Sequence, residues 1–226
     1  MNPRNPQAPH WALSPTFCLS LLLALPLLVA PAAHEARAQQ ADTRGPDQTV
    51  KATITDVMDA IRKDPAARAG DPERTYRIVQ QRFLPSTDFL LTTQYAVGPA
   101  WAKATPAQRD ALFTQFQTLL ARTYALQLTQ MQGENTQFKF PPSAKPAPGA
   151  GDAIVHTLVL SGGDTNPVDY RMRKTAAGWK IYDIDMMGAW MIQVYREQFA
   201  GQLASGGIDG LIKYLAAHNG AAERGS

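Results

Sequence analysis

Cysteine is nearly absent from this chain of 226 residues. The one cysteine, Cys18, lies in an apolar stretch near the N-terminus, where it follows Thr16 and Phe17 and not the small residues of a lipoprotein site. If export removes this stretch, the protein has no thiol, so disulfide bonds and a cysteine-linked lipid anchor are excluded. The roughly 190 residues that remain must be stabilised by their core alone, and they suffice for one domain of ordinary size.

Long apolar runs are also rare, and the one that occurs is FCLSLLLALPLLVA at Phe17–Ala30. A basic start precedes it and small residues follow at Ala36 and Ala38, which is the pattern of a secretory signal peptide over residues 1–38. An uncleaved membrane anchor fits less well, because Pro26 interrupts the run and a span needs roughly 20 apolar residues. The pattern predicts a soluble protein that, in a bacterium, is exported to the periplasm.

We therefore expect signal cleavage after Ala38, so that the exported protein begins at Gln39. N-terminal sequencing of the exported material checks this expectation. Exported protein that still contains Leu21–Val29 would contradict it and would overturn the prediction of a soluble protein.

Charge of one sign is not in excess, because the formal net charge of the whole chain is only +3. Arg4, Arg37 and Glu35 leave with the signal, so two bases and one acid are lost and the formal charge becomes +2. A nearly neutral protein gives no reason to expect a nucleic-acid partner.

Sequence motifs of common catalytic sites are missing as well. The patterns G-x-x-x-x-G-K-[ST], H-E-x-x-H and G-x-S-x-G do not occur. His10 and His34 leave with the signal, and His218 lies near the C-terminus. We interpret His156 as a structural residue of a strand, since a general base also requires an orienting partner within reach.

Two carboxylates, Asp183 and Asp185, are spaced two residues apart and so share one face of a predicted strand. They allow two interpretations: a pair for acid–base or metal chemistry, or residues that end the strand and cap the following helix. We favour capping, because no third metal ligand is evident. The sequence therefore predicts no enzyme, no metal site and no cofactor.

The first half of the mature chain has helical periodicity. Asp71 and Pro72 form the N-cap and first position of one predicted helix. Thr105 and Gln108 form a capping box at the start of a long helix over Ala104–Leu128. An earlier helix is indicated by apolar residues at helical spacing, namely Ile54, Val57, Met58 and Ile61.

After Gly133 the period changes to two, as strands require. Helical periodicity returns at Gly188, ends at Gly206 or Gly207, and is followed by a last helix. This order predicts an α+β fold with N-terminal helices, a twisted antiparallel sheet of about four strands and C-terminal helices. The predicted strands are 135–140, 153–162, 168–174 and 179–186. The expected divisions are the signal peptide 1–38, a flexible leader 39–48, one domain 49–219 and a flexible tail 220–226.

Apolar residues are abundant on the predicted elements. Nearly half of the circumference of the helix at Ala104–Leu128 is apolar, although about 100° is enough to pack a helix on a core. Either the surplus belongs to a closed core or it lines an apolar pocket on the concave side of the sheet. The spacing alone favours the closed core, whereas methionines favour the pocket because their flexible side chains adapt to variable ligands. A pocket of this kind should measure several hundred Å³ (about 300–1,000 Å³ is usual for ligand sites).

Two stretches resemble a known family: FLPSTDFLLTTQYAVGPAWAKATPAQRDALFTQFQTLLARTYALQL and GWKIYDIDMMGAWMIQVYREQFAGQLASGGIDGLIKYL. The most specific parts are ATPAQRDALFTQF, W-x-x-YD and GGIDGL, none of which is a catalytic signature. Over about Thr49–His218 the chain is similar to the MlaC/Ttg2D group, the toluene-tolerance periplasmic phospholipid-binding proteins, and to its hopanoid-associated relatives. The Pro-rich loop Pro141–Gly151 is longer than is typical of this group.

This resemblance implies a periplasmic carrier that holds the acyl chains of a glycerophospholipid between helices and a twisted sheet. It also implies partners, namely an inner-membrane lipid-transport ABC complex and an outer-membrane lipoprotein complex, and a role in outer-membrane lipid asymmetry. Two alternatives remain: a carrier of hopanoids or other polycyclic lipids, and a periplasmic adaptor with a closed core that binds only proteins. For the headgroup, Arg171 or Arg173 is at best near a pocket mouth, and we favour solvated strand-face positions for both.

The residues that we expect to contact lipid come from the long helix, the strands and the helix that follows them. They are Phe89, Leu112, Phe116, Leu119, Leu120, Tyr124, Leu128, Phe138, Phe140, Leu158, Tyr170, Met172, Ile181, Met187, Trp190, Met191 and Val194.

Overall fold

A computed structural model describes residues 43–130, 136–144, 146–147, 149–186 and 188–224. All of them belong to the compact unit Gln39–Ser226. The predicted signal peptide and its cleavage site lie outside the described residues, as does Met187. Within the described ranges, no helix combines the length and the apolar character that a membrane crossing requires.

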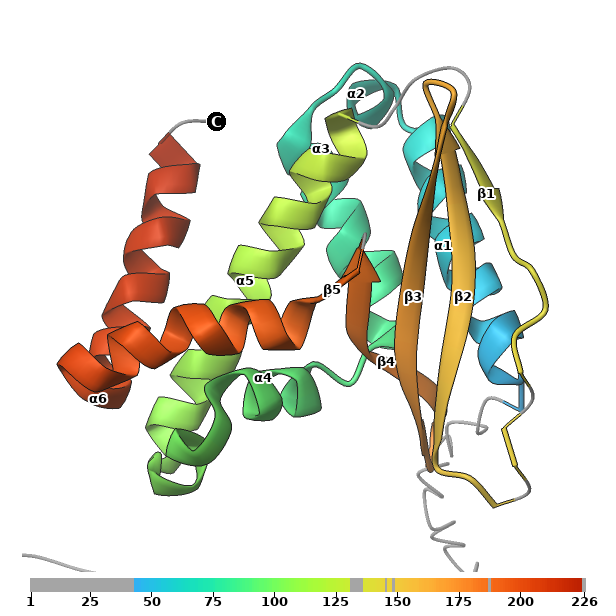
Figure 1. Ribbon diagram of the computed structural model, residues 1–226. Helices are drawn as coiled ribbons and strands as arrows, with labels where there is room; N and C mark the ends of the chain where they lie inside the picture. Colours follow the sequence, from blue (N-terminus) through green and yellow to red (C-terminus); the bar gives the residue numbers. More distant parts are fainter. Residues whose placement is uncertain (1–42, 131–135, 145, 148, 187, 225–226) are drawn as a thin grey trace, which may run out of the picture. The chain divides into compact units, whose positions relative to one another are not determined.

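The described elements are helices, short helical turns and antiparallel strands, which confirms the predicted α+β class (Figure 1). The turn η1 is a π-helix, whereas η2 and η3 are 3-10 helices. In chain order the elements are α1 (Pro46–Lys63), α2 (Pro65–Arg68), α3 (Pro72–Ile78), η1 (Val79–Phe83), η2 (Leu84–Ser86), α4 (Phe89–Val97), η3 (Gly98–Lys103), α5 (Pro106–Gln130), β1 (Gln137–Lys139), β2 (Asp152–Ser161), β3 (Asp164–Thr175), β4 (Gly178–Met186), β5 (Ala189–Trp190) and α6 (Met191–Arg224).

Both predicted helix starts are confirmed by side-chain caps. The carboxylate of Asp71 accepts a hydrogen bond from the backbone N–H of Arg74 at 3.0 Å at the start of α3. At the start of α5, the backbone N–H of Gln108 donates to the hydroxyl of Thr105 at 3.2 Å, and the Gln108 side chain accepts from the Thr105 N–H at 3.0 Å. These bonds satisfy backbone donors that the first turn of a helix leaves unpaired.

The sheet is an antiparallel meander in the order β1-β2-β3-β4-β5, one strand more than expected. The additional strand, β5, pairs Trp190 with Asp185. Trp190 therefore lies in a strand and not in the following helix, where the sequence pattern placed it. The turn that causes this is built on Gly188, which has a positive φ of 87° and donates its N–H to the Asp185 carboxylate at 2.7 Å.

Helices pack against the sheet from different elements of the chain. Helix α1 contacts β2 and β4, and α4 and α6 contact β4, while α5 packs against α3, α4 and α6 (Figure 1). Helix α6 is bent at Gly207, whose φ of 61° separates two helical segments as predicted. Its second segment continues to Arg224, past the point where we expected a flexible tail, and α1 begins at Pro46, inside the expected leader.

Most buried apolar residues in the described ranges group into four clusters, three of which are linked by Phe83. The helical cluster joins α4, α5 and α6 and contains Phe89, Ala96, Val97, Leu112, Phe116, Leu120, Met191, Ile192, Phe199, Leu211 and Leu215. The sheet cluster joins α1 to the sheet and contains Val50, Val155, Tyr170, Met172, Trp179, Ile181 and Ile184. The two smaller clusters are Val57, Ile61, Ala67 and Ile78, and Val79, Ala121 and Ala125.

Candidate functional site

An apolar cavity lies where these four clusters meet. Its wall takes Leu120 from the helical cluster, Ile181 from the sheet cluster, and Val57 and Val79 from the two smaller clusters. The cavity volume is about 140 Å³, and all the space between its walls that no atom fills, open mouth included, is about 1060 Å³. The volume of 140 Å³ is smaller than the several hundred Å³ that we expected.

The long helix α5 divides its apolar face along its length. Leu112 and Phe116, in its N-terminal half, are 0% exposed and belong to the helical cluster, away from the cavity. Leu120, Tyr124 and Leu128, in its C-terminal half, line the cavity. The wide apolar face therefore serves two purposes, since one half of the helix packs in a closed core and the other half faces open space.

About half of the residues expected at a lipid pocket do lie on the cavity wall. They come from α4, α5, the strands and the start of α6, so the structure brings together segments far apart in sequence. They are Phe89, Leu120, Tyr124, Leu128, Phe138, Tyr170, Ile181 and Met191.

The other described residues in that prediction lie away from the cavity. Most are packed in the clusters: Leu112, Phe116 and Met172 are fully buried there, and Leu119 and Phe140 pack against them. Leu158 lies on the opposite face of β2 from the buried Val155 and Val159, Trp190 lies under the Arg171 side chain, and Val194 is exposed on α6.

The prediction missed the part of the wall that comes from α1 and from the segment after α3. Ile54, Val57 and Met58 were recognised as one face of a helix, but nothing in their spacing indicates what that face contacts. Val79 and Phe83 lie in the π-helix η1, a rare element that often occurs at functional sites. The remaining missed lining residues are Leu84, Thr87, Thr92, Ala121, Gln127, Val159, Val168, Tyr182, Asp183, Ile184 and Met186.

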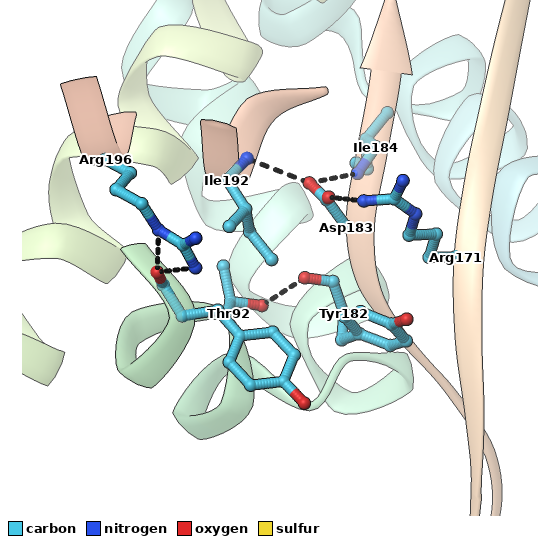
Figure 2. A network of polar contacts seen from close by, with 8 residues as sticks. Thr92, Arg171, Tyr182, Asp183, Ile184, Ile192 and Arg196 are labelled. Atoms are coloured by element: carbon cyan, nitrogen blue, oxygen red, sulfur yellow. Dashed lines mark hydrogen bonds and ion pairs between the residues drawn. The ribbon is translucent and has the colours of Figure 1, made fainter. Parts of the chain in front are cut away.

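One charged group, Asp183, reaches the cavity wall, and its charge is compensated (Figure 2). Its side chain is fully buried, and one carboxylate oxygen accepts the backbone N–H groups of Ile184 and Ile192, both at 3.0 Å. The other oxygen contacts the guanidinium of Arg171 at 3.1 Å. That guanidinium stacks over the Trp190 ring, 3.7 Å from the ring centroid. Asp183 thus caps α6 and ties it to β3 and β4. The predicted helix cap holds for Asp183 alone, which lies inside β4 and does not end it, because Asp185 accepts the N–H of Gly188 in the turn before β5.

The buried position of Asp183 gives it a distinctive pH dependence. Burial raises the pKa of Asp183 above its usual 3.8, although the Ile192 and Ile184 N–H groups and Arg171 partly offset the rise. Between the unfolded and folded pKa values the native state binds more protons than the unfolded state, so this group's contribution to stability falls as pH rises. We expect the stability advantage of wild type over Asp183→Asn to shrink from about pH 4 upward, in urea unfolding at several pH values. An advantage that grows with pH would contradict this expectation.

The remaining candidate polar residues have structural partners outside the cavity wall. His156 Nδ1 lies 2.9 Å from the Asp169 carboxylate on the next strand, and its side chain is 53% exposed. Arg173 lies 3.5 Å from the carboxylate of Asp88, the N-cap of α4. Among the residues that the structure describes, no three His, Cys, Asp or Glu side chains are grouped so that they could hold a metal.

The fold and the site together define a class of protein: an α+β domain with an apolar cavity enclosed between an antiparallel sheet and helices. The chain belongs to the MlaC protein family, whose family model matches residues 51–217. This match confirms the resemblance found in the sequence, and it covers all of the strands and most of the helices.

Individual relatives agree with the family assignment. The chain is similar to the toluene tolerance protein ttg2D of Pseudomonas putida, with 23% identity over 197 residues that make up 84% of this chain and 83% of the relative. It is also similar to the phospholipid-binding protein from Ralstonia solanacearum, solved in complex with a phospholipid. That similarity has a TM-score of 0.74 and 34% identity and covers 80% of this chain and 99% of the solved chain.

Proposed function

We propose that this protein is a periplasmic carrier that binds the acyl chains of a glycerophospholipid and moves the lipid between outer- and inner-membrane complexes. The observation that carries the proposal is the apolar cavity at the junction of the four clusters. The phospholipid bound to the related Ralstonia solanacearum protein supports it. Such a carrier would help to maintain the lipid asymmetry of the outer membrane, and it would need no enzymatic activity.

The energetics of the transfer set what the cavity must do. Each methylene group exposed to water costs about 0.8 kcal/mol, so two acyl chains of ordinary length represent on the order of 20 kcal/mol. The carrier must therefore cover nearly all of the chain surface, yet it must not bind so tightly that it cannot release the lipid to a bilayer. A wall made mainly of aliphatic and aromatic side chains meets the first requirement.

A double-chain lipid needs more room than the 140 Å³ of the cavity. We propose that the helices and the sheet move apart at the cavity when the lipid enters. The four clusters allow this movement, because the walls that would separate belong to different clusters and each cluster stays packed. We propose that the π-helix η1 takes part in this movement, because Phe83 packs against three of the clusters.

Extraction of the purified full-length exported protein with organic solvent, followed by mass spectrometry, tests the proposed function. We expect glycerophospholipid in an amount comparable to that of the protein. Hopanoids or other polycyclic lipids in its place would support the alternative carrier, which needs a shorter and broader cavity. Protein that carries no lipid and takes none from vesicles would favour the adaptor that binds only proteins.

A further inference from the structure

Three tyrosines line the cavity: Tyr124 comes from α5, Tyr170 from β3 and Tyr182 from β4. The Tyr124 hydroxyl has no hydrogen-bond partner among the described residues. The hydroxyl of Tyr124 is therefore available to a ligand in the cavity.

The Tyr124 phenol remains a hydrogen-bond donor at any physiological pH. Burial raises its pKa well above the usual value, and the nearby Tyr195, Asp183 and Tyr170 raise it further. The hydroxyl of a buried tyrosine usually has a hydrogen-bond partner, because burying a polar group without one costs free energy. A bound ligand with an acceptor at this position would supply that partner.

The position of Tyr124 along α5 indicates which part of a lipid it meets. Gln127 is the exposed lining residue on this helix, and Tyr124 lies three residues before it, or about 4.5 Å along the helix axis. Leu120, a further turn inward, is only 3% exposed. Exposure thus falls from Gln127 through Tyr124 to Leu120, so Tyr124 lies between the open side of the cavity and its apolar interior.

We propose that the Tyr124 hydroxyl donates a hydrogen bond to an ester carbonyl oxygen of the bound glycerophospholipid and selects ester-linked over ether-linked chains. This inference rests on the proposed function. The ester carbonyl is the last strong acceptor before the hydrocarbon begins, so it lies at the boundary where Tyr124 stands. A lipid with ether-linked chains has the same headgroup and chain length but no carbonyl oxygen projecting from the chain, so the phenol loses the acceptor at that position.

A competition between two lipids tests the proposal. The exported protein is incubated with vesicles that contain equal amounts of dipalmitoyl phosphatidylglycerol and its dihexadecyl ether analogue, and the bound lipids are extracted and quantified by mass spectrometry. We expect wild type to enrich the ester-linked lipid about three- to tenfold. In Tyr124→Phe the ratio should fall to nearly that of the vesicles, while the total amount of bound lipid changes little.

A variant that removes a hydroxyl away from the cavity wall serves as a matched control. Tyr195→Phe changes a partly buried tyrosine that packs on Phe116, with ring centroids 4.9 Å apart, and that is not among the residues lining the cavity. It should keep the wild-type enrichment. Wild type that binds the two lipids equally, or Tyr124→Phe that keeps the enrichment, would overturn the role of Tyr124 and leave the carrier function standing. Wild type that takes up neither lipid would instead overturn the proposed function, and the inference with it.

Discussion

Asp183→Ala is expected to lower the free energy of unfolding by about 3 kcal/mol. The change removes the only side-chain acceptor that the structure gives to the buried N–H groups of Ile184 and Ile192, and each buried donor without a partner costs about 1–3 kcal/mol. It also removes the anion that faces Arg171 at 3.1 Å. Because Arg171 remains 37% exposed and can be hydrated, most of the loss should come from the two N–H groups. Urea unfolding at neutral pH, followed by circular dichroism, measures the change.

Two variants separate the roles of this carboxylate. Asp183→Asn keeps a carbonyl oxygen that can accept from Ile192 and loses only the negative charge, so it should destabilise the protein less than Asp183→Ala. Asp185→Ala removes a partly exposed carboxylate that accepts the N–H of Gly188 at 2.7 Å, and it should cost about 1 kcal/mol. Equal effects of the alanine changes at Asp183 and Asp185 would show that the link from β4 to α6 is not important for stability.

Local signals explain why the sequence predicted the fold well. The caps of α3 and α5 depend on residues three positions apart, and a glycine with positive φ ends the first segment of α6, so each is decided within a few residues. The strand β5 was missed because it has only two residues, too few to show a period. Its existence depends on the turn at Gly188, which the pattern of apolar residues does not report.

The cavity wall could be predicted only in part, because periodicity identifies the inward face of an element but not what lies opposite that face. On β2, Leu158 is not on the cavity wall, and its neighbour Val159 lines the cavity beside Phe138, its partner on β1. On α5, Phe116 packs against α6, whereas Leu120, on the same apolar face, lines the cavity. That difference depends on the bend and direction of α6, which belong to the tertiary structure.

The two halves of α5 allow a second large effect to be tested, because the same change from leucine to glutamate can be made in each half. Leu120 and Leu112 are both buried leucines of the same helix, 3% and 0% exposed, but only Leu120 lines the cavity. In Leu120→Glu the new carboxylate has the space of the cavity on one side, which water can enter, so its desolvation should be limited. We expect a folded protein with modest destabilisation that has lost most of its lipid, because the charge lies where acyl chains would pack.

Leu112→Glu places the same carboxylate inside the helical cluster at a fully buried position that does not line the cavity. Burying an unpaired charge there should cost several kcal/mol, enough to unfold a domain whose total stability is about 5–15 kcal/mol. Thermal midpoint and co-purified phospholipid, measured on the same preparations, distinguish the two variants. Unfolding of both would show that Leu120 belongs to the closed core, whereas a folded Leu120→Glu protein with full lipid content would show that the acyl chains lie elsewhere.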